Sequence, residues 1–236
     1  GGPDPYVYEV GNNLFISPLK PVGSWSFEEG SGTVAADSSG NNNNGTLMNG
    51  PTWTTGQVGG ALSFDGVDDY VDCGKEAGNL SSIGAAEIWV YTDRDFPSDS
   101  TSVYYRGIID KTIGGLSGQG SWYMDWYGTN SSRTLRAGIA DAGGSNAVII
   151  ANYNFNHQWH HFVLTWDGSQ VKLYDNGNLL GSINQTKNPQ TLDTSLRIGR
   201  AFNSSAYSWQ GLIDEFRIYN RALSAEEIKR HYEESK

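Results

Sequence analysis

Short runs of alternating apolar and polar residues, separated by turn residues, recur along most of the chain. The densest apolar run covers residues 159–166, and residues 171–174 alternate before an Asp-Asn-Gly turn at residues 175–177. Alternation with a period of two is typical of strands that bury one face, and Asn-Gly is a favoured hairpin turn. The pattern predicts about a dozen short strands. They are expected at residues 22–27, 61–64, 70–73, 87–91, 107–110, 121–127, 135–140, 148–153, 159–166, 171–174, 179–182, 196–199 and 212–219.

The one helix that the sequence predicts lies at the C-terminus. Ser224 can cap its first turn, and Glu227, three residues later, completes a capping box. Ile228 and Tyr232 stand four residues apart and would share its apolar face. Because the strands do not alternate with helices, the pattern favours an all-β fold of two packed antiparallel sheets, a β-sandwich, with this short helix appended.

Three segments are expected along the chain. Residues 1–20 place prolines among glycines and asparagines, which predicts an irregular, extended lead-in or linker. Residues 21–223 are expected to form one β-sandwich domain, since sandwiches often exceed the usual domain length. Residues 224–236 are expected to form the C-terminal helix, packed on that domain.

Charge and cysteine content narrow the range of functions. The formal net charge is −10, which disfavours nucleic-acid binding because phosphates require clustered Lys and Arg. Cys73 is the one cysteine, so no disulfide can form within the chain, and we expect it to be a small buried strand residue. No apolar run approaches the roughly 18 residues of a membrane-spanning helix. We therefore expect no nucleic-acid partner, no membrane insertion of this chain, and a monomer in isolation.

Five sequence blocks, in a fixed order, carry a family resemblance. They are residues 25–30 (WSFEEG), 37–41 (DSSGN), 61–71 (ALSFDGVDDYV), 159–168 (WHHFVLTWDG) and 211–224 (GLIDEFRIYNRALS). Together they resemble laminin-G-like domains, the concanavalin-A-like jelly rolls. The resemblance implies one convex and one concave sheet in a secreted or surface-displayed module that is often appended to enzymes or adhesins. It does not identify a ligand, because function varies within one fold.

The polar loop at residues 37–45 predicts a structural calcium ion. The loop has no apolar side chain, and calcium takes carboxylate, amide and backbone carbonyl oxygens. The ligands that we expect from this loop are Asp37, Asn41, Asn43 and the Gly45 carbonyl. The resemblance implies one more, Asp214, because family members use the aspartate of the closing block. The alternative is a solvated asparagine-rich turn in which Asp37 forms an Asx-turn.

Aromatic and planar polar residues gather on the middle strands and predict a ligand groove on the concave sheet. Aromatic faces and planar hydrogen-bonding groups suit sugar rings. The candidates on these strands are Tyr105, Arg106, Asp110, Lys111 and Trp126, and Arg200 and Trp209 come from a separate stretch, mostly loop, that is expected to rim the same groove. Trp122 and Trp126 share one strand face, which either contacts a ligand or faces the core. Arg106, Asp110 and Lys111 either belong to the groove or form an internal ion pair.

Catalytic signatures are absent from the sequence. A retaining glycosidase needs two carboxylates about 5–5.5 Å apart, and glucan-hydrolysing members of the family place them in a Glu-x-Asp-x-x-Glu strand that this chain lacks. We therefore expect a non-catalytic, calcium-stabilised, lectin-like carbohydrate-binding module outside the cell or on its surface. One alternative is a protein-binding or adhesive domain of a pilin-like surface protein, since residues 8–18 resemble a pilin-like stretch. A glycoside hydrolase is the third class.

Overall fold

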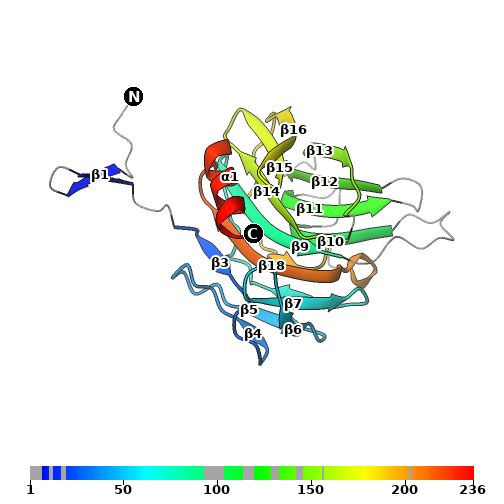
Figure 1. The fold of residues 1–236 in the computed structure, drawn as a ribbon. Helices are drawn as coiled ribbons and strands as arrows, with labels where there is room; N and C mark the ends of the chain where they lie inside the picture. The colour runs from blue at the N-terminus through cyan, green and yellow to red at the C-terminus, as the bar shows by residue number, and fades with distance from the viewer. Residues whose placement is uncertain are drawn as a thin grey trace.

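Two antiparallel sheets of eight strands each pack face to face around an apolar core (Figure 1). The structure is a computed structural model, and it describes residues 7–10, 13–16, 20–92, 104–113, 120–128, 133–141, 146–155, 157–201 and 204–236. The strands form because β-branched and aromatic residues alternate with polar ones over short stretches. The predicted β-sandwich with a short C-terminal helix is confirmed.

The first sheet has the strand order β13, β12, β11, β10, β17, β8, β5, β4. Its strands are β4 (Val34–Ala35), β5 (Gly45–Met48), β8 (Tyr70–Asp72), β10 (Tyr104–Thr112), β11 (Gly120–Gly128), β12 (Arg133–Ala140), β13 (Asn146–Asn152) and β17 (Arg197–Ile198). The first half of the chain thus supplies one end of this sheet, and residues beyond 100 supply most of the other.

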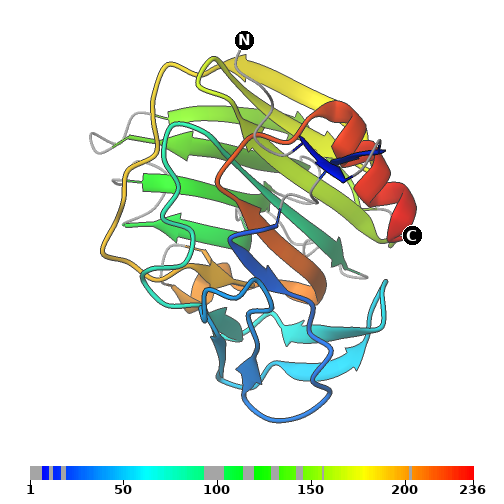
Figure 2. The same cartoon turned by 90° about the vertical axis from the view of Figure 1, so that its left-hand side faces the viewer.

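The second sheet has the order β16, β15, β14, β9, β18, β7, β6, and β3 pairs with β18 off this path, as Figure 2 shows. Its strands are β3 (Gly23–Trp25), β6 (Thr52–Thr55), β7 (Gly60–Asp65), β9 (Gly84–Tyr91), β14 (His160–Trp166), β15 (Gln170–Asp175), β16 (Asn178–Asn184) and β18 (Gln210–Tyr219). The long strand β18 therefore joins the start of the sandwich to its end.

Alternation along each strand decides which side chains reach the core. In β11, Trp122, Met124 and Trp126 have no exposed surface and pack in the core. Asp125 and Tyr127 have the opposite parity and point to the outer face of the first sheet. Strand pairing then sets which outer residues are neighbours.

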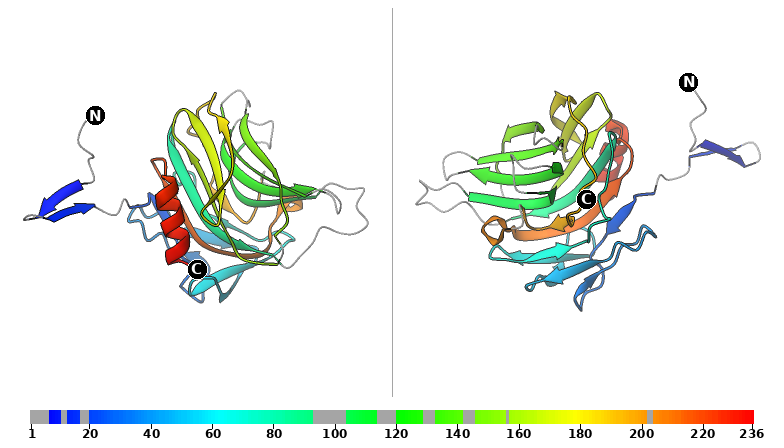
Figure 3. Two further views of the ribbon diagram at one scale, coloured as in Figure 1. Left: turned by 45° about the horizontal axis from the view of Figure 1, so that its top comes forward. Right: turned by 180° about the vertical axis from the view of Figure 1, so that it is seen from behind.

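Helix α1 (Ala225–Glu234) covers part of the outer face of the second sheet (Figure 3). The predicted capping box is confirmed, because the Ser224 hydroxyl accepts a hydrogen bond from the Glu227 backbone N–H and the Glu227 carboxylate accepts one from Ser224 N–H. Ile228 of α1 is fully buried, as expected. No helix among the described residues is long and apolar enough to cross a membrane.

Two segments differ from the sequence prediction. Within residues 1–20, expected to be irregular, β1 (Val7–Val10) pairs with β2 (Asn13–Ile16) in a hairpin that stands apart from the sandwich in Figure 1. β-Prone Val, Tyr, Phe and Ile in these two runs account for the hairpin. The strands β5 and β6 lie in a segment with many polar residues, where apolar alternation gives no signal.

Candidate functional site

Four side chains on the outer face of the first sheet form a continuous strip, which we call the tyrosine platform: Tyr207, Tyr105, Tyr127 and Arg136. Tyr207, in the short helix η1 (Ser205–Tyr207), meets Tyr105 edge-on, with the ring centres 5.1 Å apart. Tyr105 stacks on Tyr127 at 5.5 Å with an interplanar angle of 13°. The Arg136 guanidinium lies 3.9 Å from the centre of the Tyr127 ring. All three tyrosines are partly exposed, so the strip can contact a ligand.

A buried ion pair fixes the arginine end of the platform. Arg136 donates two hydrogen bonds to Asp125, from Nε to Oδ1 at 2.8 Å and from Nη2 to Oδ2 at 2.6 Å. Burial raises the pKa of Asp125 to about 6, although the hydrogen bonds and charge of Arg136 oppose this rise. Because a bidentate pair fixes the plane of the guanidinium, Arg136 is held in one orientation over Tyr127.

The two tryptophans predicted to contact a ligand are core residues. Trp126 and Trp209 have no exposed surface. Both pack against Phe155, with ring-centre distances of 4.8 Å for Trp126 and 5.4 Å for Trp209. Trp126 has the core-facing parity of β11, one position away from Tyr127. The predicted ligand contact of these two rings is therefore wrong, and the core alternative is correct.

Asp110 and Lys111, also predicted to face a ligand, are buried structural residues without exposed surface. The Asp110 carboxylate accepts a hydrogen bond from Arg197 Nη1 at 3.5 Å. Lys111 Nζ donates to the backbone carbonyls of Lys75 at 2.5 Å and Thr194 at 2.7 Å. Burial lowers the pKa of Lys111 to about 8. The prediction of ligand contact is wrong for both, and the internal ion pair forms with Arg197.

The other two predicted arginines lie off the platform. Arg106 is opposite Trp126 in the β10–β11 register, so it has the parity of the core-facing residues. The Arg200 guanidinium lies 4.6 Å from the centre of the Tyr70 ring. Of the seven residues proposed for the groove, Tyr105 is the one that the structure places on the platform.

Asp37 holds its own loop together. Its Oδ1 accepts hydrogen bonds from the backbone N–H groups of Ser24 (3.0 Å) and Ser39 (2.9 Å), and its Oδ2 accepts one from Asn43 (2.9 Å). Burial alone would raise the pKa of Asp37, but the hydrogen bonds from Ser39, Asn43 and Ser24 outweigh it and lower the pKa. The Asn41 amide donates to the Ser39 hydroxyl at 3.4 Å. These contacts match the Asx-turn alternative, and both carboxylate oxygens of Asp37 are already engaged.

Asp37→Ala is expected to lower the free energy of unfolding by about 1–3 kcal/mol, because three backbone N–H groups lose their acceptor. Urea denaturation measures the loss. Asp193→Ala is the control, since it removes only an exposed ion pair with Lys75 and should cost about 1 kcal/mol or less. Equal stability of the two variants would show that the Asp37 contacts do not stabilise the loop.

Gly45, another predicted calcium ligand, is part of the first sheet. It begins β5 and pairs with Ala35 of β4. A Cβ atom at this position would lie 2.5 Å from Val71 Cγ1 and 3.4 Å from the Cys73 sulfur. Glycine is therefore required here by close packing against β8, which explains its presence without a metal.

Asp214 and Glu28 both approach one turn, residues 56–60. Asp214 Oδ2 accepts a hydrogen bond from Val58 N–H at 2.9 Å, and Glu28 Oε1 accepts one from Gly60 N–H at 3.0 Å. Asp214 Oδ1 is buried and has no hydrogen-bond partner. Burial, together with the nearby charge of Glu215, raises the pKa of Asp214 to about 7. An unpaired buried carboxylate oxygen is a favourable position for a cation.

Asp37 and Asp214, the two predicted calcium ligands with carboxylates, accept hydrogen bonds from different segments of the chain. Among the described residues, these two carboxylates share no hydrogen-bond partner. Asp37 thus accepts from backbone N–H groups of Ser24, Ser39 and Asn43, and Asp214 from that of Val58, and the calcium ion that the sequence predicts stays a prediction. Glu28, a residue that the sequence did not indicate, is another carboxylate that accepts a hydrogen bond from this turn.

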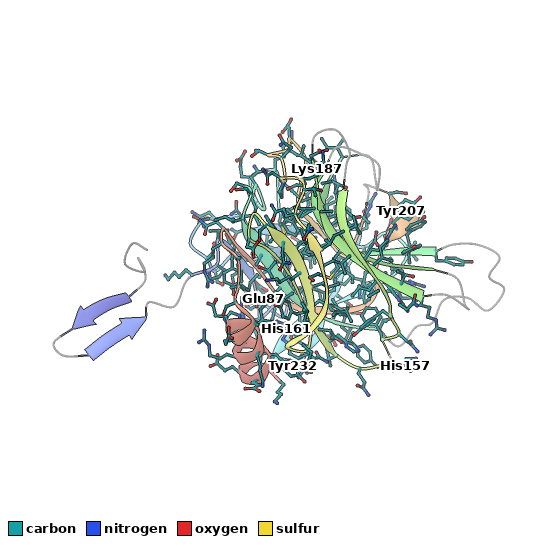
Figure 4. All side chains as sticks on the ribbon, turned by 90° about the horizontal axis from the view of Figure 1, so that it is seen from above. Glu87, His157, His161, Lys187, Tyr207 and Tyr232 are labelled. Atoms are coloured by element: carbon teal, nitrogen blue, oxygen red, sulfur yellow. The ribbon has the colours of Figure 1, made fainter. Side chains whose placement is uncertain are left out.

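A further group of charged residues is buried beneath α1. Glu87 of β9 has no exposed surface and is hydrogen-bonded to Arg217 at 3.2 Å and to His231 at 2.9 Å. His161 Nε2 lies 3.7 Å from the same carboxylate. Figure 4 shows Glu87 and His161 beside α1, on the other side of the molecule from Tyr207. No motif marks this cluster, because its members come from four different elements.

The sequence itself has a family match. Residues 65–229 match the concanavalin A-like lectin/glucanases superfamily. Among curated proteins, no sequence matches the chain significantly. The matched region includes β8 to β18 and the first half of α1, and therefore strands of both sheets.

Solved structures of similar fold include several binding domains. The binding domain of Paraclostridial Mosquitocidal Protein 1 superposes with a TM-score of 0.71 at 18% identity, over 90% of this chain and 52% of that one. A second similar structure is domain 4 of AbnA, a GH43 extracellular arabinanase from Geobacillus stearothermophilus, in complex with arabinotriose. Its TM-score is 0.64 at 20% identity, and the match covers 89% of this chain and 97% of that domain. The botulinum neurotoxin serotype D ligand binding domain in complex with N-acetylneuraminic acid superposes with a TM-score of 0.61 at 18% identity. The match covers 91% of this chain and 51% of that domain.

These structural likenesses concern the fold. The chain spans about half the length of the two toxin domains and nearly all of the arabinanase domain. At such identities, a common architecture does not carry over a ligand. The family match and the two-sheet architecture agree, and the chain belongs to the concanavalin A-like lectin/glucanase superfamily.

Proposed function

We propose that this chain is a non-catalytic carbohydrate-binding domain whose ligand lies on the tyrosine platform. The observation that carries the proposal is the row of Tyr207, Tyr105 and Tyr127, with Arg136 held over its end. Ring faces suit the apolar faces of sugars, and the phenol hydroxyls can hydrogen-bond to sugar hydroxyls. A preorganised row of this kind limits the entropy lost on binding.

The related structures support a glycan as the ligand class. The structure of domain 4 of the arabinanase is a complex with arabinotriose, and that of the botulinum domain is a complex with N-acetylneuraminic acid. One of these ligands is a neutral oligosaccharide and the other is an acidic sugar, so the two differ in charge. The choice between them for this chain depends on its own side chains.

The acidic residues of the platform face support binding without hydrolysis. Asp125 is paired with Arg136 and Asp110 with Arg197. A glycosidase needs one carboxyl group that protonates the leaving group and a second that attacks or activates water. Carboxylates that hold arginines do not suit these roles. Release of sugar from a β-glucan by the purified protein would contradict the proposal.

We further propose a structural calcium ion at Asp214, with Glu28 as the second carboxylate. The unpaired Asp214 Oδ1 and the approach of both side chains to the turn at residues 56–60 support this site. Backbone carbonyls of the turn can supply further oxygens. The ion would neutralise two carboxylates and join β18 to the start of the sandwich. Calcium sites of extracellular modules work at the calcium levels found outside cells, so we also propose an extracellular or cell-surface location.

Tyr127→Ala is expected to weaken glycan binding about tenfold or more, because it removes the ring shared by Tyr105 and Arg136. A glycan array followed by titration calorimetry measures the effect. The matched control is Tyr91→Ala, which removes a partly exposed tyrosine of β9 whose ring centre lies 5.7 Å from that of Trp159. The control should bind normally.

Two outcomes would contradict the platform as the site. One is equal weakening by both tyrosine variants, which would indicate a general loss of structure. The other is the absence of glycan binding while the protein still adheres to cells or binds a surface protein. The second outcome would favour a protein-binding, adhesive domain, which is the alternative function.

A further inference from the structure

A polar cavity of about 350 Å³ lies between the loop at residues 37–45, the segment at residues 74–80 and the end of β18. Its polar lining comes from Asn41, Asn43, Glu76, Asn79 and Asn220, and we call it the asparagine pocket. The volume falls within the range of about 300–1,000 Å³ that is typical of small-molecule sites. None of the tyrosine platform residues lines it.

Several polar groups of the asparagine pocket have no partner in the protein. Asn79 Oδ1 is buried and makes no hydrogen bond. Within the described part of the chain, the side chain of the partly buried Asn43 and those of the exposed Glu76 and Asn220 make none either, so they are free to contact a ligand. Buried polar groups are almost always hydrogen-bonded, so the unpaired Asn79 oxygen indicates a missing partner.

The asparagine-rich wall of the pocket is held by buried contacts. The carboxylate of Asp37 binds the backbone of Asn43 and Ser39 from inside the loop. The indole nitrogen of Trp25, a core residue, donates to the Asn43 carbonyl at 3.0 Å. The wall that carries Asn41 and Asn43 is therefore fixed in the free protein.

The opposite wall is held in the same way. Trp122 Nε1 donates to the Gly78 carbonyl at 2.9 Å, and Lys111 Nζ donates to the Lys75 carbonyl. Both side chains have no exposed surface. The segment that carries Glu76 and Asn79 is thus anchored on each side. Two anchored walls limit the ordering cost of binding, which is the usual design of a small-ligand site.

We infer that the asparagine pocket binds one residue of a neutral saccharide. An amide side chain offers both an acceptor oxygen and donor N–H groups, which match sugar hydroxyls that donate and accept. Glu76 adds an acceptor, and its negative charge, in a chain of net charge −10, disfavours acidic sugars. Calcium prefers a compact set of six to eight oxygens at about 2.3–2.6 Å, usually with several carboxylates, and this cavity has one.

This inference rests on the proposed function for the class of ligand and adds a second place of contact. The tyrosine platform and the asparagine pocket share no residue. Loss of one site should therefore leave the other intact, and the two proposals can fail separately.

The test is a titration of the ¹⁵N-labelled protein with methyl glycosides of glucose, galactose, mannose and arabinose, and with N-acetylneuraminic acid. At least one neutral glycoside, at up to about 50 mM, is expected to shift the amide signals of residues 41–43 and 78–79. N-Acetylneuraminic acid should leave them unchanged. Asn79→Ala should weaken this binding about fivefold or more, whereas the exposed-asparagine control Asn184→Ala should not.

Several outcomes would overturn the inference. Signal changes confined to the tyrosine platform would assign all binding to that site. Changes at residues 41–43 and 78–79 on addition of calcium alone would make the pocket a metal site. The absence of any change there with every neutral glycoside, while Tyr127-dependent binding is retained, would remove the pocket and keep the proposed function.

Discussion

Replacing Glu87 by alanine is expected to lower the free energy of unfolding by about 3–5 kcal/mol. The carboxylate has no exposed surface and is hydrogen-bonded to Tyr219 at 2.6 Å, to Arg217 at 3.2 Å and to His231 of α1 at 2.9 Å. Without it, the buried Tyr219 hydroxyl loses its acceptor, and the largely buried Arg217 guanidinium keeps only Glu215 as a carboxylate partner. Chemical denaturation with an unchanged m-value would measure the loss as a change in stability.

Two further variants define the cause of this loss. Glu226→Ala removes an exposed carboxylate from the same helix region, and it should change the stability by less than about 0.5 kcal/mol. Glu87→Gln keeps the shape of the side chain and removes only its charge. Its loss of unfolding free energy should therefore lie between those of Glu87→Ala and Glu226→Ala. A Glu87→Ala protein as stable as Glu226→Ala would show that the cluster does not hold α1 to the sheet.

Acid should weaken the same cluster in two steps. Burial lowers the pKa of His161 to about 4, so the unfolded chain takes up that proton first, and stability is lost as the pH falls from about 6.5 to about 4. Burial alone would raise the pKa of Glu87, but the hydrogen bond to His231 and the charges of His161, His231 and Arg217 lower it to about 2. The contribution of Glu87 is therefore lost between about pH 4.5 and 2. The second step should be absent from Glu87→Gln.

The sandwich could be predicted because its signals are local. The capping box of Ser224 and Glu227 needs only neighbouring residues, and so does the alternation of β11. Alternation alone does not say which face is buried, however. Trp126 and Tyr127 are adjacent, and packing against Phe155 from another segment decides that the tryptophan takes the core.

The tyrosine platform could not be predicted in full because strand register determines which of its residues are neighbours. Arg136 lies at one end of the platform because it is opposite Asp125 in the β11–β12 ladder. Tyr207 reaches Tyr105 across about a hundred residues of sequence, through a loop with no pattern of its own. Tyr105 and Tyr127 lie opposite each other in the β10–β11 ladder, so their side chains share one face of the sheet. This shared face was the one feature of the platform that strand alternation could have indicated.

The calcium loop shows a different limit of sequence reasoning. The residue types around Asp37 suit a metal, but the same oxygens also suit backbone N–H groups, and the folded chain supplies three of these, two from the loop and one from Ser24 of β3. The choice depends on backbone geometry, which composition does not contain. Asp214 lacks such donors at one of its oxygens, and so it keeps the capacity to bind a cation.

Calcium is expected to stabilise the protein more at pH 8 than at pH 5. Burial and the charge of Glu215 raise the pKa of Asp214 to about 7, from an ordinary 3.8. Without calcium, the folded chain keeps this proton up to about pH 7 and the unfolded chain releases it near pH 4, so stability falls by roughly 4 kcal/mol as the pH rises between these values. Calcium binds the carboxylate form and offsets this loss, by about 2.7 kcal/mol at 100 times its Kd. Melting temperatures with calcium and with chelator, at both pH values, measure the difference.

Three variants separate this site from other effects of calcium. Asp214→Asn has no carboxylate to titrate, so it should lose both the fall in stability above pH 4 and the response to calcium. Glu28→Gln should weaken the response, because one charged ligand is removed. Asp37→Asn should keep it, because both oxygens of Asp37 already accept backbone hydrogen bonds. A calcium response that survives in Asp214→Asn and disappears in Asp37→Asn would instead place the ion in the asparagine-rich loop.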